Sequence, residues 1–230
     1  MLFVAILALG LAVRFYRIDY QSFWNDEVLT VFNTNLPLAQ VIINPNDINI
    51  LPLYYLTIYP FLKFGNAEFW LRFPSAFVGV LSLALFFFIL KKWLGEKIAL
   101  VGAFLFSLSP FHVWYSQEAR PYALLVFLGL LAMWLFQKVE SQPDRPGPLV
   151  ALVLVTVSTL YCHTVAIPFV GMIGLFLLVG AWNSKRKTWF GAVVGIALLS
   201  LPAFYRLLII PPVGSANTYQ EFNPLSLAYT

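Results

Sequence analysis

Long stretches without a charged side chain recur along this chain and limit what it can fold into. A membrane-spanning helix needs about 20 mainly apolar residues. Uncharged stretches of this kind cover residues 73–90, 98–115, 121–137, 146–162, 164–182 and 188–205, and residues 1–18 add another if Arg14 and Arg17 reach the membrane surface. Hydrophobic residues make up 60% of the sequence and charged ones 10%, so a soluble domain of 230 residues would lack polar surface. The sequence predicts an all-α, polytopic membrane protein with about seven transmembrane helices.

The segment 51–64 tests the topology because it is apolar and aromatic but short, with prolines at 52 and 60. Apolar runs of about 10–14 residues are more often interfacial than spanning. If this segment does not span and the amino terminus is cytoplasmic, the basic loops all lie inside, as membrane proteins prefer. Those loops contain Lys91, Lys92, Lys97, Lys138, Arg145, Lys185, Arg186 and Lys187. We therefore expect residues 19–72 to form an outer loop with one or two short helices lying on the membrane.

The expected organisation is one transmembrane module over residues 1–230. It consists of a first span at 1–18, the outer loop 19–72, six further spans within 73–210 and an outer segment at 211–230. The first span lacks a basic start and a clear cleavage site, so we expect it to be retained. The net charge of +4 sits at helix ends and short loops, which membrane topology explains without nucleic-acid binding. With Cys162 as the only cysteine, neither an intrachain disulfide nor a zinc site is indicated.

Two adjacent carboxylates, Asp26 and Glu27, stand out in the outer loop. One interpretation is a solvated helix start, with Asn25 as the N-cap and the acids in the first turn. The other is a general base or metal ligand that Phe23 and Trp24 hold against the apolar surface of the membrane.

The turn at 115–121 and the helix end at His163 would face the same outer side as these acids. Glu118 and Arg120 form either a local ion pair or part of a site, and a guanidinium is well suited to phosphate. A lone histidine such as His163 is more often a satisfied polar residue than a catalyst. The topology nevertheless predicts that these polar side chains converge.

Two further arginines, Arg14 and Arg72, lie at predicted outer ends of spans. Each is typical of an anchor at the membrane surface, although either could neutralise a phosphate headgroup. The aromatic excess favours an interfacial belt over sugar stacking. The belt would contain Tyr54, Tyr55, Tyr59, Trp70 and Trp114.

The order of these motifs resembles the PMT/ArnT-type membrane glycosyltransferases of the GT-C superfamily. The matching pieces are Arg14-Phe15-Tyr16, Ser22 to Glu27, Pro52 to Tyr55, Gly65 to Glu68, Leu71 to Ser75, Ser109-Pro110-Phe111, Tyr115 to Tyr122 and His163. Where many relatives have His-Pro-Pro, this chain has Ile50-Leu51-Pro52. Relatives are also usually longer, so we expect a truncated form of the fold.

The resemblance implies transfer of a sugar, with inversion, from a polyprenyl-phosphate donor to an acceptor protein, lipid or glycan on the outer face of a cell membrane. It implies that Asp26 is the catalytic base with Glu27 as its paired carboxylate. The residues implied for binding the donor phosphate are Arg72, Arg120 and Arg14. Glu118, Tyr122 and His163 would support the site, and Asp26 with Glu118 would be the ligands if a divalent metal ion takes part. The lipid-linked sugar is a donor substrate, and the sequence indicates no cofactor with certainty.

Two alternatives stay open at this point. A transporter or lipid flippase would carry polar residues along a path through the membrane midplane, whereas the charges here cluster on one side. A noncatalytic, truncated paralogue would act as a partner subunit of a longer relative. Walker, Rossmann and nucleophile-elbow motifs are absent from the sequence, so soluble-nucleotide enzymes of those types lack support.

Overall fold

The computed structural model describes residues 1–43, 49–65, 67–143, 145–184 and 186–209, and the predicted outer segment at 211–230 lies outside them. Within these ranges the chain is helical, and the only extended pairing is an isolated bridge between Ile50 and His163. The α-helices are α1 (Leu2–Phe15), α2 (Asn25–Thr34), α3 (Leu38–Ile43), α4 (Pro52–Ile58), α5 (Glu68–Leu94), α6 (Glu96–Ser107), α7 (Pro110–Ser116), α8 (Tyr122–Ser141), α9 (Pro146–Cys162), α10 (Ile167–Ser184) and α11 (Lys187–Ile209). Two 3₁₀-helices, η1 (Tyr59–Phe64) and η2 (Thr164–Ala166), join them.

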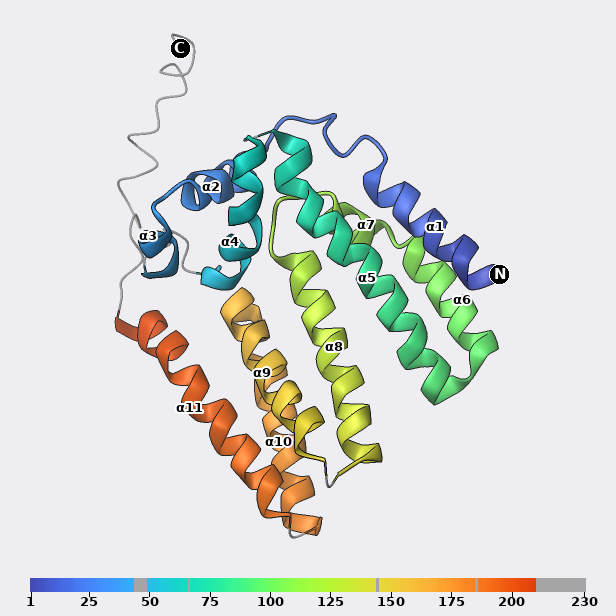
Figure 1. The fold of residues 1–230 in the computed structure, drawn as a ribbon, viewed down its shortest axis with the longest axis vertical. Helices are drawn as coiled ribbons and strands as arrows, with labels where there is room; N and C mark the ends of the chain where they lie inside the picture. Colours follow the sequence, from blue (N-terminus) through green and yellow to red (C-terminus); the bar gives the residue numbers. More distant parts are fainter. Residues whose placement is uncertain (44–48, 66, 144, 185, 210–230) are drawn as a thin grey trace.

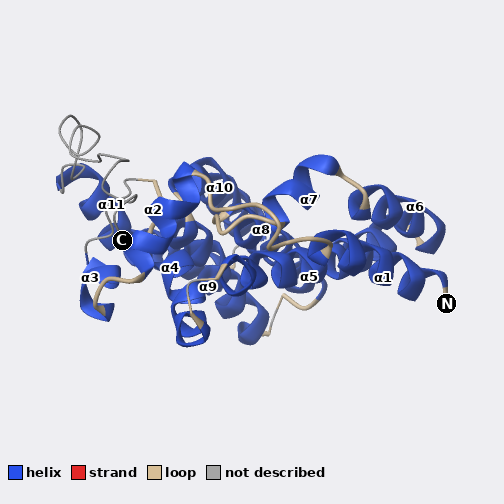
Figure 2. Cartoon of the chain, turned by 90° about the horizontal axis from the view of Figure 1, so that it is seen from above, coloured by secondary structure: helices blue, strands red, loops and turns tan. Residues whose placement is uncertain are grey.

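The long helices lie side by side, and the short helices α2 and α4 lie near their upper ends in Figure 1. Helix α5 packs against α1, α6 and α8, and α9 packs against α8, α10 and α11. Seen from above, the molecule is elongated, with α1 and α6 at one end and α3 and α11 at the other (Figure 2). Most connections are short, so successive long helices run in opposite directions.

Four helical segments are long and apolar enough to cross a membrane: Glu68–Leu94, Tyr122–Ser141, Thr164–Asn183 and Lys187–Leu208. A fifth is obtained if α6 and α7 together form one broken span. The apolar helices α1 and α9 are shorter, at 14 and 17 residues. The described residues therefore have the architecture of a helical membrane protein.

The stretch at 98–115 is not one helix, as a single uncharged span would suggest. It is divided into α6 and α7, which meet at an angle of 59°. Pro110 opens α7 and has no backbone N–H to continue the hydrogen-bond ladder. Arg14, which is completely buried, donates to the last carbonyls of α6 at Ser107 (3.2 Å) and Phe106 (3.5 Å). The guanidinium gives the Ser107 carbonyl a donor where the break interrupts the helical hydrogen bonds, and it adds a second donor to the Phe106 carbonyl, which also accepts from the Ser109 N–H.

The segment 19–72, which the sequence predicted to be an outer loop, contains more helical structure than predicted. Three short α-helices and η1 occupy its described part, and none is long enough to span a membrane. The prediction of an interfacial aromatic belt is wrong for Tyr54 and Tyr55, which are 1% and 0% exposed. Their hydroxyl oxygens lie 3.3 Å from Ser75 Oγ and Asn33 Nδ2, so both rings belong to the core between α2, α4 and α5.

A glycine on α5 determines how closely α7 and α1 can approach. A Cβ on Gly79 would collide with the side chain of Ser116, coming within 2.9 Å of its Cβ, and would lie 3.2 Å from Arg14 Cδ. We expect Gly79→Ala to lower the free energy of unfolding in detergent by about 1–3 kcal/mol, as overpacking does. Gly129→Ala on α8 is the matched control, because nothing lies within 4 Å of a Cβ there. Equal melting temperatures for the two variants would contradict this packing.

Candidate functional site

The two adjacent acids Asp26 and Glu27 lie in the first turn of α2, as the helix-start interpretation predicted. The N-cap is Trp24 rather than Asn25, and its extended backbone starts the helix. The Trp24 backbone N–H donates to Glu27 Oε2 at 3.4 Å, so Glu27 folds back over the helix start. Because successive helical residues point about 100° apart, Asp26 and Glu27 face different surroundings.

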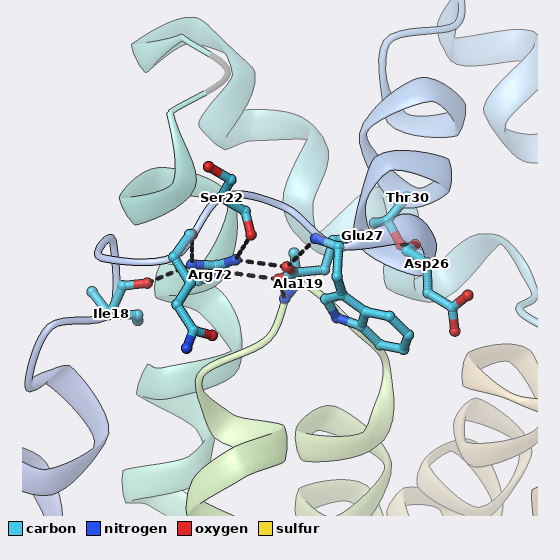
Figure 3. Close-up of polar contacts among 9 residues, drawn as sticks. Ile18, Ser22, Asp26, Glu27, Thr30, Arg72 and Ala119 are labelled. Carbon is cyan, nitrogen blue, oxygen red and sulfur yellow. Dashed lines mark hydrogen bonds and ion pairs between the residues drawn. The ribbon is translucent and has the colours of Figure 1, made fainter. Parts of the chain in front are cut away.

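Glu27 is completely buried and bonded on both carboxylate oxygens. Arg72 on α5 donates to Oε1 at 2.8 Å and to Oε2 at 2.6 Å, in a two-bond guanidinium–carboxylate pair (Figure 3). The backbone N–H of Ala119 also donates to Oε1, at 2.7 Å. Charge-assisted bonds of this geometry are the strong ones in proteins, and inside a low-dielectric interior they hold three segments in one position.

Arg72 directs all five of its N–H groups to protein acceptors. Besides Glu27, these are the carbonyl oxygens of Ile18 and Gln21, each 2.8 Å from Nη1, and of Ser22, 3.4 Å from Nη2. Since a guanidinium has five N–H donors, none is left for a phosphate in this arrangement. The phosphate-binding role expected for Arg72 stays a prediction that requires the pair with Glu27 to open.

Asp26 has a more open environment than its neighbour. Its side chain is 43% exposed and points away from Arg72 (Figure 3). Arg120 Nη2 lies 3.4 Å from Asp26 Oδ2, and Arg120 Nη1 donates to the Asp26 carbonyl at 3.2 Å. Of the two adjacent acids, Asp26 is the one whose carboxylate an incoming group can reach.

Arg120, Tyr122 and His163 form a row that begins beside Asp26. The Arg120 guanidinium carbon lies 5.8 Å from the centre of the Tyr122 ring, and the Tyr122 and His163 ring centres are 5.7 Å apart. His163 Nδ1 accepts a hydrogen bond from the Val165 N–H at 3.0 Å, so in the neutral ring the hydrogen is on Nε2. The structure thus brings together four of the predicted site residues, from α2, the 117–121 turn, α8 and the end of α9.

The 117–121 turn has little regular structure of its own and is held by its neighbours. Each anchor is a hydrogen bond to a different helix or helix end. Gln117 donates to the carbonyls of Val13 and Tyr16, Ala119 to Glu27, Ser75 to the Arg120 carbonyl at 3.3 Å, and the Cys162 thiol to the Pro121 carbonyl at 3.6 Å. Sequence reasoning missed Gln117 and Ser75 as anchors, and the bond from Ala119 uses the backbone, which leaves no sequence signal.

Glu118 is 7% exposed, and within the described residues its Oε2 has no hydrogen-bond partner. Burial raises the pKa of its carboxyl, with the charge of Glu27 adding to the rise, while Trp114, Arg120 and Arg72 oppose it. A raised pKa disfavours the ionised carboxylate, which is the form that binds a divalent ion. No three His, Cys, Asp or Glu side chains gather into a metal-binding group in the described ranges. The geometry therefore gives no support to the metal pair Asp26 and Glu118, which stays a prediction.

Arg14 lies apart from this group. Its hydrogen bonds join α1 to the α6–α7 break, where His112 Nδ1 is 2.8 Å from Arg14 Nη2. Because arginine can only donate, His112 accepts at Nδ1. The contacts described for Arg14 are those of a residue that supports the broken helix, and its expected contact with phosphate stays a prediction.

Breaking the buried ion pair should destabilise the fold. Arg72→Met leaves Glu27 buried without its cation, so the free energy of unfolding in detergent should fall by about 3–5 kcal/mol. The double variant Glu27→Leu/Arg72→Met should recover part of this loss, because apolar replacements of similar size remove both desolvated charges. Lys91→Met is the control, since the Lys91–Glu96 pair is exposed. If Arg72→Met and Lys91→Met melt at the same temperature, the pair does not hold the fold.

The chain is similar to known membrane glycosyltransferases. Residues 50–205 match the model of the family described as dolichyl-phosphate-mannose-protein mannosyltransferase. A glycotransferase of Archaeoglobus fulgidus, named dolichyl-phosphooligosaccharide-protein glycotransferase 2, is 31% identical over 60% of this chain and 27% of its own length. YkcB of Bacillus subtilis, named as a proposed mannosyltransferase, is 27% identical over 68% of this chain and 23% of its own length. No solved structure matches the chain.

The chain spans about a quarter of the length of these two curated relatives. The range that the family model matches contains Arg72, Arg120 and His163, whereas Asp26 and Glu27 precede it. This match confirms the family resemblance that the order of motifs indicated. Because it covers more than half of the residues, the chain belongs to the dolichyl-phosphate-mannose-protein mannosyltransferase family of membrane glycosyltransferases.

Proposed function

We propose that this chain carries the catalytic centre of a glycosyltransferase that moves a sugar from a polyprenyl-phosphate donor to an acceptor hydroxyl, with inversion at the anomeric carbon. The observation that carries the proposal is the contrast between two neighbouring carboxylates. Glu27 is buried and fully bonded, whereas Asp26 is half-open beside a buried arginine. The names of the family and of the Archaeoglobus fulgidus relative support the lipid-phosphate donor.

Asp26 is the proposed base. A carboxylate that accepts the proton of the acceptor hydroxyl makes its oxygen a better nucleophile. That oxygen forms a bond to the anomeric carbon while the bond between this carbon and the donor phosphate oxygen breaks. The proton stays on Asp26, and the polyprenyl phosphate leaves with the bonding electron pair. Glu27 supports the reaction by holding the first turn of α2 in place.

Arg120 is the proposed partner of the leaving phosphate, which gains negative charge as the bond breaks. Its side chain is 7% exposed, so the guanidinium acts where water screens it little. Tyr122 and His163, which continue the row from Arg120, provide hydroxyl and imidazole donors next to the same position. A pre-positioned cation of this kind stabilises developing charge without reorganising during the reaction.

The proposed topology has seven spans and an outer-facing site. The proposed spans are α1, α5, α6 with α7, α8, α9, α10 and α11. The α5–α6, α8–α9 and α10–α11 connections lie at the lower end, and the sequence places most of the basic residues there. The site residues lie at the opposite end, which the positive-inside rule assigns to the outer side of a cell membrane.

Removing the proposed base should abolish transfer while the protein stays folded. Asp26→Asn keeps the shape of the side chain but cannot accept the proton at neutral pH, so kcat should fall by about 100-fold or more. Transfer from a synthetic polyprenyl-phosphate sugar by the purified, full-length protein is the measurement. Asp19→Asn, an exposed acid of the same loop, should keep wild-type activity. Wild-type turnover by Asp26→Asn would rule out this base.

The orientation can be tested with single cysteines at the two ends of the molecule. Cys162 is buried, so the native thiol should give little background. A membrane-impermeant maleimide should label Asp19→Cys in intact cells, because that residue lies in the outer loop. Lys97→Cys, at the start of α6, should be labelled only after the membrane is permeabilised. The reverse pattern would contradict the proposed topology.

A further inference from the structure

His112 is a buried side chain that the reaction proposed above does not use. It lies in the first turn of α7 and is 5% exposed. Its Nδ1 is 2.8 Å from Arg14 Nη2, and its ring packs on Phe106 with the ring centres 4.3 Å apart. Because arginine can only donate, Nδ1 is the acceptor and the neutral ring carries its hydrogen on Nε2. His112 thus receives a charge-assisted hydrogen bond on the α7 side of the helix break.

The guanidinium of Arg14 connects both sides of that break to α1. It donates to the carbonyls of Phe106 and Ser107 at the end of α6, and to His112 at the start of α7. Among the contacts described for Arg14, the imidazole is the one side-chain acceptor, and the others are backbone carbonyls of α1 and α6. The imidazole is therefore the acceptor through which α7 is tied to Arg14.

Helix α7 is held at its other end as well. The carboxamide of Gln117, directly after α7, donates to the carbonyls of Val13 and Tyr16 at 3.0 and 3.1 Å. Ser116 lies against α5, where a Cβ on Gly79 would come within 2.9 Å of the Ser116 Cβ. With seven residues, α7 makes about two turns. A helix this short that is bonded to its neighbours at both ends moves as one rigid piece.

The direction of α7 matters because Arg120 follows it closely in the 117–121 turn. Ala119 and Ser75 hold this turn from the side of α2 and α5, and α7 holds it from the side of α1. The two Arg120 contacts with Asp26 measure 3.2 and 3.4 Å, so a small shift of the turn breaks them. A misplacement of about 1 Å in a catalytic group can lower a rate about 100-fold.

We propose that His112 is a positioning residue for Arg120. By accepting from Arg14 at Nδ1, it sets the direction of α7 and, through the 117–121 turn, the distance between Arg120 and Asp26. This inference rests on the proposed function, because that function assigns the leaving phosphate to Arg120 and the proton to Asp26. His112 acts on the reaction only through these residues.

Three substitutions separate the acceptor from the bulk of the ring. His112→Asn places its amide oxygen close to the position of Nδ1, His112→Gln carries the oxygen one carbon further, and His112→Leu has no acceptor. Transfer from a synthetic polyprenyl-phosphate sugar is measured with full-length protein in nanodiscs. We expect His112→Asn to keep kcat within about threefold of the wild type.

His112→Gln and His112→Leu should lower kcat at least about tenfold with KM within about twofold, because Arg120 is proposed to act on charge that develops in the transition state. The folded fraction, measured by size-exclusion chromatography, corrects kcat for loss of protein. Phe111→Leu is the control, since this residue of the same helix is 72% exposed, and it should change neither constant.

Hydrogen exchange followed by mass spectrometry reports on the turn without turnover. The Ala119 N–H is bonded to Glu27 and should exchange slowly in the wild type. In His112→Leu the peptide that contains residues 117–121 should exchange at least about tenfold faster, and in His112→Asn it should exchange like the wild type.

Wild-type kcat in His112→Leu, equal kcat in His112→Asn and His112→Leu, or unchanged exchange at 117–121 would overturn the positioning role. A raised KM at unchanged kcat would also overturn it, since His112 would then act in binding. If His112→Leu does not fold, His112→Asn and His112→Gln carry the same comparison. Wild-type turnover by Asp26→Asn would reject the proposed function alone, and faster exchange in His112→Leu would still support the effect of His112 on the turn.

Discussion

The buried pair between Glu27 and Arg72 is the interaction on which the arrangement of the site depends. Two charges withdrawn from water lose hydration that their mutual attraction only partly returns, so the pair adds little to net stability compared with apolar residues of the same size. Its contribution is geometric. The planar guanidinium of Arg72 donates two hydrogen bonds to the Glu27 carboxylate and three to backbone carbonyl oxygens of the loop before α2. Because its donors point in fixed directions, these bonds set the position of α5 relative to α2 and to that loop.

This constraint also explains how two neighbouring acids can have different roles. Rotation by one residue in the first turn of α2 carries a side chain from the interior to the surface. The carboxylate of Glu27 is bonded to Arg72 inside the protein, whereas the carboxylate of Asp26 lies at the surface beside Arg120. The proposed centre needs both residues, because Asp26 is positioned only while its neighbour Glu27 holds the helix in place.

Much of this arrangement could be predicted from residue order. The uncharged stretches correspond to long helices, and alternating helix direction brings Asp26, Arg120 and His163 to one end. The division between α6 and α7 was harder to predict, because Arg14 stabilises the break through contacts far apart in sequence. The burial of Tyr54 and Tyr55 depends on α2 and α5 covering α4, which local composition does not encode. The hydrogen bonds from Arg72 to the carbonyl oxygens of the loop before α2 also depend on tertiary structure, so the sequence did not predict them.

The 117–121 turn has a consequence for how such a centre comes into being. Its shape comes from α1, α2, α5 and α9, which are separated in sequence and would enter the membrane one after another. All of the hydrogen bonds described for the turn are therefore present only when α9 has packed against the other helices. A partly inserted chain therefore has Asp26 and Arg120 but no fixed distance between them. A centre that uses both residues is therefore a property of the assembled helices and not of any one segment of the chain.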